Sequence, residues 1–409
     1  MGVDSESPGS GKEPAVLVVG GGVGGLAAAE RLADQARVTL YERQHYDDKR
    51  VNCGEAINDT TLLPLDPTPE NGFVNDIDGF ELLIHADTDS GPEREPLATA
   101  RLHCPPGYIC DRNVVERRWA QRLAERGVEI RDGEALRTHE YRDLLDDNEY
   151  DYIIDSTGQP SLTLRALDRE PAYTGDMVAL NAEVEGDFSA YEKLPRIFFE
   201  GYVGYAWVFP KSDSRANIGI GWAGDQRPDH YFSAFEHACL RNDLPVPPRT
   251  AVNIDTIPRG PSLGPDRLAL PEKRVFLTGD AAGIANRYQG EGICQAIRSA
   301  YLLTDLIDSG REAEYGARLY ASMKSEYRLA HLMRGVWVEH EDPTLLAAVA
   351  RTLDGLTIEQ ITREPRVVYR RLLRRPTLAT RVLGNRGMLR RCVAAYTNTW
   401  EYSPQERHS

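Results

Sequence analysis

The chain has 409 residues, of which 41% are hydrophobic and 27% are charged, and its net charge is −15 at pH 7. This composition is typical of a folded protein with two or three structural units, and no apolar run reaches the ~18 residues that a membrane-spanning helix needs. The acidic excess argues against general binding to nucleic acid, and the rarity of lysine beside many arginines agrees with a halophilic source.

The N-terminal segment and the cysteines argue against a secreted, disulfide-bonded protein and against a metal site. Residues 1–13 are small and polar and lack the apolar core of a signal peptide, so we expect a disordered lead-in to a cytoplasmic protein. The six cysteines lie far apart without a CxxC pair, which indicates reduced thiols. His103, Cys104 and Cys110 have no fourth partner at the spacing of a metal ligand, so no metal is expected.

The first apolar strand, 15–19, leads into a glycine-rich turn and a helix of small residues. Gly20 lets the chain turn, Gly22 leaves room for a pyrophosphate, and Gly25 lets the helix pack close to the strand. Glu42 ends the next strand at the spacing of a carboxylate that accepts from a ribose hydroxyl, and it would repel a 2′-phosphate. The pattern therefore predicts FAD or NAD. The expected contacts to the dinucleotide from this unit are Gly20, Gly22, Val23, Gly25, Glu42 and Arg43.

The residue patterns farther along predict how the chain is divided. Alternating apolar and polar residues in 61–105 and 171–260 indicate an antiparallel sheet that forms a substrate domain. Residues 331–409 are expected to be a helical C-terminal region. The predicted fold class is α/β, a Rossmann-like parallel-sheet domain with this antiparallel domain inserted. The dinucleotide-binding domain is expected to be discontinuous, comprising 14–60, 106–170 and 261–330.

A second motif decides between the two dinucleotides. The apolar strand 274–278 ends in Gly279-Asp280, and the glycine-rich stretch 289–292 precedes a helix expected from Cys294 to Ile307. A helix dipole there would stabilise the negative charge of a reduced flavin. These residues resemble the GD motif of the p-hydroxybenzoate-hydroxylase superfamily of FAD proteins. The resemblance implies that Asp280 bonds a ribityl hydroxyl and places Gly290, Gly292 and Ile293 around FAD.

Two further elements support FAD and bear on its reductant. Asp111-Arg112, before a helix for which Asn113 is the expected N-cap, resembles the superfamily's DR element, whose arginine contacts the pyrophosphate. The stretch that ends at Gly158 resembles the strand end beneath the dinucleotide, and the same resemblance places Ala135 near FAD. Thr157-Gly158 stands where aromatic hydroxylases have the Asp-Gly pair used for NADPH. This weakens a monooxygenase interpretation and leaves the electron donor open between ferredoxin and NAD(P)H.

Two more stretches resemble motifs of the geranylgeranyl reductase family, including its archaeal digeranylgeranylglycerophospholipid reductases. Cys53-Gly54-Glu55 looks like the CGE loop, and 205–210 like the Tyr-x-Trp-x-Phe-Pro motif. The resemblance implies hydride transfer from reduced FAD to isolated C=C bonds of prenyl chains. It places Cys53 and Glu55 at FAD and lines the prenyl channel with Tyr205, Trp207 and Phe209. A dry aromatic wall suits a polyisoprenoid, which gains about 0.8 kcal/mol for each buried CH₂.

The reaction also needs a proton. Cys53 is the candidate catalytic residue because its loop is expected to face the flavin, although a free thiol is as often a buried structural group. Water or a donor on the substrate remains an alternative. Arg287 lies in a loop where the family usually has proline, and it is a candidate for binding an anionic headgroup.

Several alternatives stay open. The substrate is a prenylated lipid or a quinone, so a menaquinone side-chain reductase is the nearest alternative. A flavin-dependent monooxygenase or halogenase follows, although no catalytic lysine is evident. A prenyl-binding protein without flavin is the non-enzyme alternative, and the intact Arg112 and Asp280 speak against it. The basic run 369–375, with later arginines at helical spacing, predicts either a solvated helix face or peripheral contact with the inner membrane surface.

Overall fold

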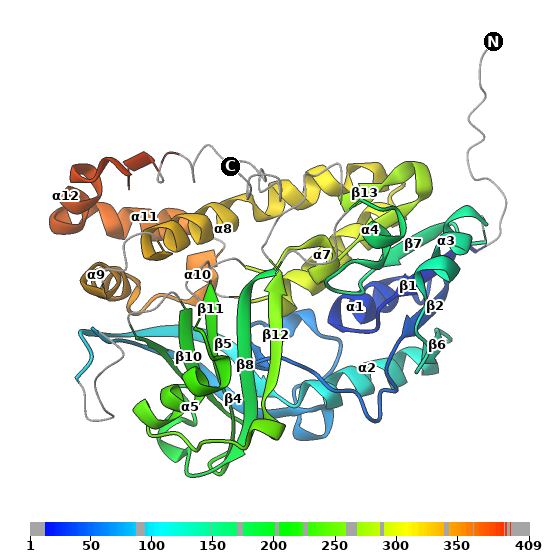
Figure 1. Cartoon of the computed structure of the whole chain (residues 1–409). Coiled ribbons are helices and arrows are strands. Elements are labelled where there is room, and N and C mark those ends of the chain that lie inside the picture. The colour runs from blue at the N-terminus through cyan, green and yellow to red at the C-terminus, as the bar shows by residue number, and fades with distance from the viewer. Residues whose placement is uncertain are drawn as a thin grey trace.

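Two β-sheets and the helices that cover them make up the described part of the chain (Figure 1). The structure is a computed structural model, and the predicted lead-in at 1–13 and Arg287 lie outside its described residues, except for Glu13. The described residues are 13–86, 95–147, 149–169, 175–200, 204–223, 228–258, 268–286, 290–338, 343–362, 364–387, 389–390 and 393.

The first sheet has the strand order β13-β14-β7-β1-β2-β6. Its neighbours are parallel, except that β13 runs antiparallel to β14. Every residue of the central strand β1 is buried, as its uninterrupted apolar sequence requires when helices cover both faces of a sheet. Since the strand order reverses at β1, a ligand is expected at its carboxyl end. The strands are β1 (Ala15–Val19), β2 (Arg37–Glu42), β6 (Glu129–Asp132), β7 (Tyr152–Asp155), β13 (Ala269–Leu270) and β14 (Val275–Leu277).

The helices of this half hold the loops of the site in place. Helix α1 (Val23–Leu32) packs against both α2 (Arg112–Glu125) and α7 (Ile293–Asp308), and its alanines permit the close approach. The helix expected from Cys294 is thus present. The expectation that Asn113 caps α2 was wrong, because the helix begins at Arg112 and its N-cap is Asp111, two residues earlier. Two smaller helices, α3 (Thr138–Asp146) and α4 (Leu162–Ala166), pack together nearby.

The second sheet has the order β12-β8-β11-β10-β9-β4-β5-β3 and is antiparallel except between β4 and β9. Both of its faces are apolar. Side chains alternate along β10, so that Ala206 and Val208 pack toward α5 (Tyr231–Arg241) while Trp207 and Phe209 face the opposite side. Its strands are β3 (Ala56–Ile57), β4 (Phe73–Ile84), β5 (Ala98–Cys110), β8 (Gly175–Glu185), β9 (Arg196–Phe199), β10 (Gly204–Pro210), β11 (Arg215–Ala223) and β12 (Asn253–Pro258).

The C-terminal helices cover the face of this sheet to which Trp207 points (Figure 1). Leu353 and Val368 are buried in the same apolar cluster as Phe209, because α9 packs directly on β4 and β5. The predicted α/β class, with a second antiparallel-rich sheet and C-terminal helices, is therefore confirmed. These helices are α8 (Tyr315–Val338), α9 (Pro343–Leu353), α10 (Ile358–Thr362), α11 (Pro365–Leu373) and α12 (Pro376–Gly384).

Candidate functional site

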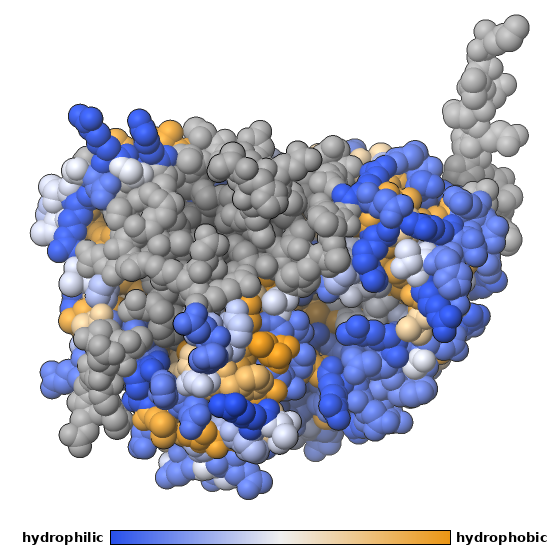
Figure 2. All heavy atoms as spheres, viewed as in Figure 1, coloured by the Kyte–Doolittle hydropathy of each residue, from blue (hydrophilic) through white to orange (hydrophobic). Residues whose placement is uncertain are grey.

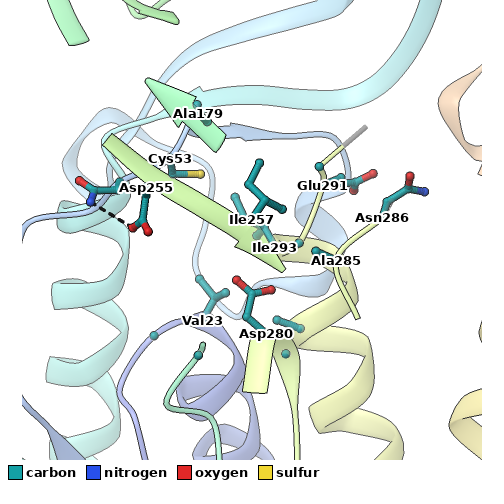
Figure 3. A pocket seen from close by; sticks show the side chains of 18 of the residues that line it. Val23, Cys53, Ala179, Asp255, Ile257, Asp280, Ala285, Asn286, Glu291 and Ile293 are labelled. Atoms are coloured by element: carbon teal, nitrogen blue, oxygen red, sulfur yellow. Dashed lines mark hydrogen bonds between the residues drawn. The ribbon is translucent and has the colours of Figure 1, made fainter. Parts of the chain in front are cut away.

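One cavity of about 830 Å³ extends from the carboxyl end of β1 to the apolar space between the second sheet and the C-terminal helices. Figure 3 shows Val23, Asp280, Ile293 and Cys53 around a common space, although they come from distant parts of the chain. Almost all of the predicted site residues line this cavity. They are Gly20, Gly22, Val23, Glu42, Arg43, Cys53, Glu55, Arg112, Ala135, Gly158, Tyr205, Trp207, Phe209, Asp280, Gly290, Gly292 and Ile293.

The β1–α1 turn forms one end of the cavity. Gly20 has φ +99°, and a Cβ there would lie 2.3 Å from the carbonyl oxygen of Ser156. A Cβ on Gly25 would lie 1.9 Å from the carbonyl oxygen of Gly20, so Gly25 serves helix packing and does not line the cavity. A Cβ on Gly22 would have only the Arg112 guanidinium within 4 Å. The N-terminus of α1 and the Arg112 cation thus leave room for an anion.

Glu42 lies on the cavity wall but has several partners. Its Oε2 accepts from the backbone N–H of Gly21 at 3.0 Å and from Lys49 Nζ at 2.8 Å, and its Oε1 accepts from the backbone N–H of Gln44. Lys49 also pairs with Glu116 at 2.9 Å, and both side chains are buried. Lys49 compensates the charge that was expected to repel a 2′-phosphate. Sequence inspection missed Lys49, because a single lysine in a polar loop carries no pattern.

Arg112 is held on the other side of Glu116. Its Nε donates to Glu116 Oε1 at 2.7 Å, so Glu116 joins Lys49 and Arg112 in one buried network. Burial alone would lower the pKa of Arg112, but the Glu116 carboxylate and the Cys53 side chain together outweigh it and raise that pKa. Arg112 and Lys49 likewise lower the pKa of Glu116 against the effect of burial. The network keeps a cation beside the space at Gly22.

The loop of Cys53 lies between this network and the second sheet. The half-buried Cys53 sulfur accepts from the backbone N–H of Glu55 at 3.3 Å. Glu55, at φ +62°, accepts from the backbone N–H of Arg112 and pairs with Lys211 at 2.7 Å. Burial raises the pKa of Glu55 in spite of Lys211. The loop is thus anchored to the first residue of α2 and to Lys211, which follows β10.

Asn217 connects this loop to the aromatic wall. Its Nδ2 donates to the carbonyl oxygen of Cys53 at 2.9 Å, and its Oδ1 accepts from Trp207 Nε1 at 3.0 Å. Asn217 was missed in the sequence, since its role depends on β11 pairing with β10. It sets the orientation of the Trp207 indole relative to Cys53.

The aromatic wall is continuous along β10. The ring centroids of Tyr205 and Trp207 are 5.9 Å apart, and those of Trp207 and Phe209 are 6.0 Å apart. Gly219 makes room for the indole, because a Cβ there would lie 2.0 Å from Trp207 Cζ2. The C-terminal helices complete this end of the cavity, although no motif was found in their sequence. Their lining residues are Leu329, Ala330, Leu353, Ile358, Ile361 and Val368.

Asp280 and the start of α7 lie in the middle of the cavity. Burial raises the pKa of Asp280, and Arg112 acts in the opposite direction. A Cβ on Gly292, the N-cap of α7, would lie 3.2 Å from Asp280 Oδ1, so the helix begins directly beside this carboxyl group. The described residues contain no group of side chains that could hold a metal ion. None of their helices has the length and hydropathy required to cross a membrane.

Comparisons with known proteins find relatives in sequence and in fold. Residues 18–46 match the NAD(P)-binding Rossmann-like domain. Digeranylgeranylglycerophospholipid reductase 2 of Methanosphaera stadtmanae is 26% identical over 344 residues, which are 77% of this chain and 84% of that protein. A geranylgeranyl bacteriochlorophyll reductase-like protein from Thermoplasma acidophilum has a TM-score of 0.64 at 18% identity, covering 91% of this chain and 98% of that one.

A halogenase, PltM, has a similar fold, with a TM-score of 0.63 at 12% identity over 96% of this chain and 88% of that one. At such low identity the two solved structures are informative about the fold alone. The sequence similarity is with the reductases and spans three quarters of the chain. The chain is therefore a homologue of the digeranylgeranylglycerophospholipid reductases, on a fold that halogenases also use.

Proposed function

We propose that this protein is an FAD-dependent oxidoreductase that saturates C=C bonds in geranylgeranyl or polyprenyl chains of membrane lipid precursors. The observation that carries the proposal is the single cavity, which joins a dinucleotide turn to an apolar compartment walled by Trp207 and Phe209. The names of the curated relatives support the same substrate class.

The residues of the cavity fit FAD. Open space at Gly22 and Gly158, the Arg112 cation and the N-terminus of α1 suit a pyrophosphate, and Glu42 and Arg43 lie at the same end. Asp280 and the N-terminus of α7 suit the ribityl chain and an electron-rich ring system. Bound FAD, once reduced, supplies a hydride.

The chain's own residues would bind the prenyl group and exclude water. Tyr205, Trp207 and Phe209 offer rigid apolar surface, and the C-terminal helices close the opposite side. Each buried CH₂ of the substrate contributes about 0.8 kcal/mol, so a long chain can be bound without specific polar contacts. Cys53 lies on the cavity wall where the two compartments meet (Figure 3), and we keep it as a candidate for contact with the reacting bond.

The test is anaerobic flavin reoxidation. We expect the dithionite-reduced protein to recover its oxidised flavin absorbance when a geranylgeranyl lipid is added without oxygen, with two hydrogens gained for each saturated bond. Gly219→Ala should abolish recovery, because the new Cβ displaces the Trp207 indole. Gly384→Ala is the control, since it adds the same methyl group outside the cavity, where no atom lies within 4 Å. Recovery only after air is admitted would contradict the proposal and favour oxygen chemistry.

The alternative functions require different substrates or residues in this cavity. A menaquinone side-chain reductase would use the same apolar wall, and the same assay with menaquinone distinguishes it. Among the described residues that line the cavity Lys49 is the single lysine, and its ion pairs with Glu42 and Glu116 disfavour a role as a halogenase's catalytic lysine. Ferredoxin or NAD(P)H is the proposed electron donor. The acidic, lysine-poor composition supports a halophilic archaeal source.

We also propose peripheral contact with the inner membrane surface through α11 and α12, in a cytoplasmic protein. Two arginines of this region have structural roles, because Arg371 donates to the carbonyl of Asp354 and Arg375 to that of Arg351, at the end of α9. Arg370 and Arg374 instead lie exposed around Leu373, which is 77% exposed. Figure 2 shows hydrophilic side chains projecting beside hydrophobic ones at this end of the molecule.

Replacing Arg370 and Arg374 by glutamine and Leu373 by serine should weaken binding to anionic phosphatidylglycerol vesicles. We expect a loss of about 1 kcal/mol for each arginine, because each basic side chain near an anionic surface contributes about that amount. Co-sedimentation measures the binding. The control is Arg311→Gln with Arg318→Gln, which removes two exposed arginines paired with Glu314. Equal binding of the two variants, or binding to neutral vesicles, would contradict the membrane proposal.

A further inference from the structure

We propose that Glu291 is the catalytic acid of the prenyl reduction, which gives the second carbon of the C=C bond its proton. The inference rests on the proposed function and names a residue that no motif indicated. Glu291 lines the cavity directly before α7, and Figure 3 shows its side chain beside Asn286 at the edge of the same space as Asp280 and Ile293.

The backbone places Glu291 between the two compartments. On one side, a Cβ on Gly290 would lie 3.7 Å from the Tyr205 hydroxyl and 3.0 Å from Ile257. On the other side, a Cβ on Gly292 would lie 3.2 Å from Asp280 Oδ1. Glu291 therefore stands where the aromatic wall meets the region assigned to the ring system of FAD.

A second carboxylate adds to the effect of burial on Glu291. Glu326 of α8 also lines the cavity, and its Oε1 accepts from Asn286 Nδ2 and from Gln295 Nε2, each at 2.9 Å. Burial raises the pKa of Glu291, and the charge of Glu326 raises it further. Both effects favour the protonated form of Glu291.

The hydrogen bonds around Glu291 and Glu326 act in two directions. Cys294 and Asn58 hydrogen-bond with Glu291 and lower its pKa, as does Arg298, but burial and Glu326 outweigh them. The buried Gln295 Oε1 has no hydrogen-bond partner among the described residues, so the cluster contains an acceptor in excess of its donors. A protonated Glu291 adds a donor to this cluster, whereas two carboxylates would add only acceptors.

Other ionisable groups of the cavity are less suited to donate. Glu55 is paired with Lys211 at 2.7 Å and accepts from the backbone of Arg112. Burial raises the pKa of Tyr205, which makes its phenol a weaker acid. The Cys53 sulfur already accepts from the backbone N–H of Glu55. A carboxyl group with a raised pKa is closest to the acidity that proton transfer near neutral pH requires.

The reduction adds a hydride to one alkene carbon and a proton to the other. One alkene carbon forms a C–H bond with the hydride that reduced FAD supplies, and the other forms a C–H bond with the carboxyl proton of Glu291. The π bond and the O–H bond break, the alkene gains two electrons and the flavin loses two. Glu291 is left as a carboxylate and recovers its proton from water before the next turnover.

The inference predicts a pH dependence. The acid form must be present, so turnover is full at low pH and is lost as pH rises through the pKa of Glu291, which lies above the ordinary value of about 4.3. Glu326 moves this loss to higher pH and Arg298 to lower pH. The other titratable or charged groups that face the cluster are Asp59, Cys104, Tyr205, Cys294 and Tyr327.

The experiment uses Glu291→Gln, which keeps the shape of the side chain and removes the proton. In the anaerobic assay we expect reoxidation by geranylgeranyl lipid to slow by about 100-fold or more, with unchanged FAD affinity. Glu326→Gln is the matched variant, and it should move the loss of turnover to lower pH because the neighbouring charge is gone. Reoxidation of Glu291→Gln at the wild-type rate and with the wild-type pH profile would overturn the assignment.

A second readout does not depend on turnover. Infrared spectra of the FAD-free protein should contain a protonated carboxyl band that titrates above the ordinary glutamate range, is absent from Glu291→Gln and persists in the exposed control Glu125→Gln. Ionisation of Glu291 in the ordinary range would also overturn the assignment. If the wild-type protein itself is not reoxidised by any prenyl lipid, the proposed function fails and the acid role fails with it. If the wild-type protein is reoxidised and Glu291→Gln behaves in the same way, the acid role fails but the proposed function stands.

Discussion

Replacing Lys49 by methionine is expected to lower the free energy of unfolding by about 3–5 kcal/mol and to weaken FAD binding. The Lys49 ammonium lies 2.8 Å from Glu42 and 2.9 Å from Glu116, and all three side chains are buried. It also donates to the carbonyl oxygen of Gly21 at 2.8 Å. Methionine would leave two carboxylates buried with less compensation, and Glu116 would hold Arg112 less firmly. Urea unfolding and FAD fluorescence titration measure the two effects.

Lys193→Met is the matched control for this prediction. Lys193 pairs with Asp76, but 47% and 66% of the two side chains are exposed, so we expect a loss below about 1 kcal/mol. Adding Glu42→Gln to Lys49→Met should recover part of the stability, since Glu116 keeps Arg112 as its partner and the charge of Glu42 is the one left uncompensated. Equal effects of the two lysine substitutions would show that the buried network does not stabilise the fold.

Gly22→Ala is expected to weaken FAD binding by about 100-fold, or about 2.8 kcal/mol, without changing the thermal unfolding midpoint. A Cβ on Gly22 would meet no protein atom closer than the Arg112 guanidinium at 3.9 Å, so the fold should accept alanine. The methyl group would instead occupy the space assigned to the pyrophosphate, at the N-terminus of α1. Calorimetry of the FAD-free protein and a flavin titration separate the two effects.

Gly25→Ala provides the contrast. Its Cβ would lie 1.9 Å from the carbonyl oxygen of Gly20, which is backbone and cannot move without displacing the turn. We therefore expect this variant to lose stability as well as FAD. Wild-type FAD affinity in Gly22→Ala would mean that the dinucleotide does not pass over this turn.

Much of the architecture could be predicted from the sequence, because its signals are local. The apolar run 15–19 followed by Gly20 and Gly22 requires a buried parallel strand and a tight turn. The strand at 275–277 before Asp280 and the helix from Ile293 follow from equally short patterns. Alternation along β10 placed Tyr205, Trp207 and Phe209 on one side of a strand, and the structure adds that this side faces the cavity.

Other features were decided by the tertiary structure alone. The ion network joins Lys49 to Glu116, and Asn217 bridges Cys53 and Trp207. The charge of Glu326 acts on Glu291 because α8 packs on α7. The C-terminal helices, which contain no recognised motif, form part of the cavity wall. Turns and periodicity depend on neighbouring residues, so the sequence by itself determined the elements and the dinucleotide turn. Pairing between distant polar side chains depends on how those elements pack, and no local pattern encodes it.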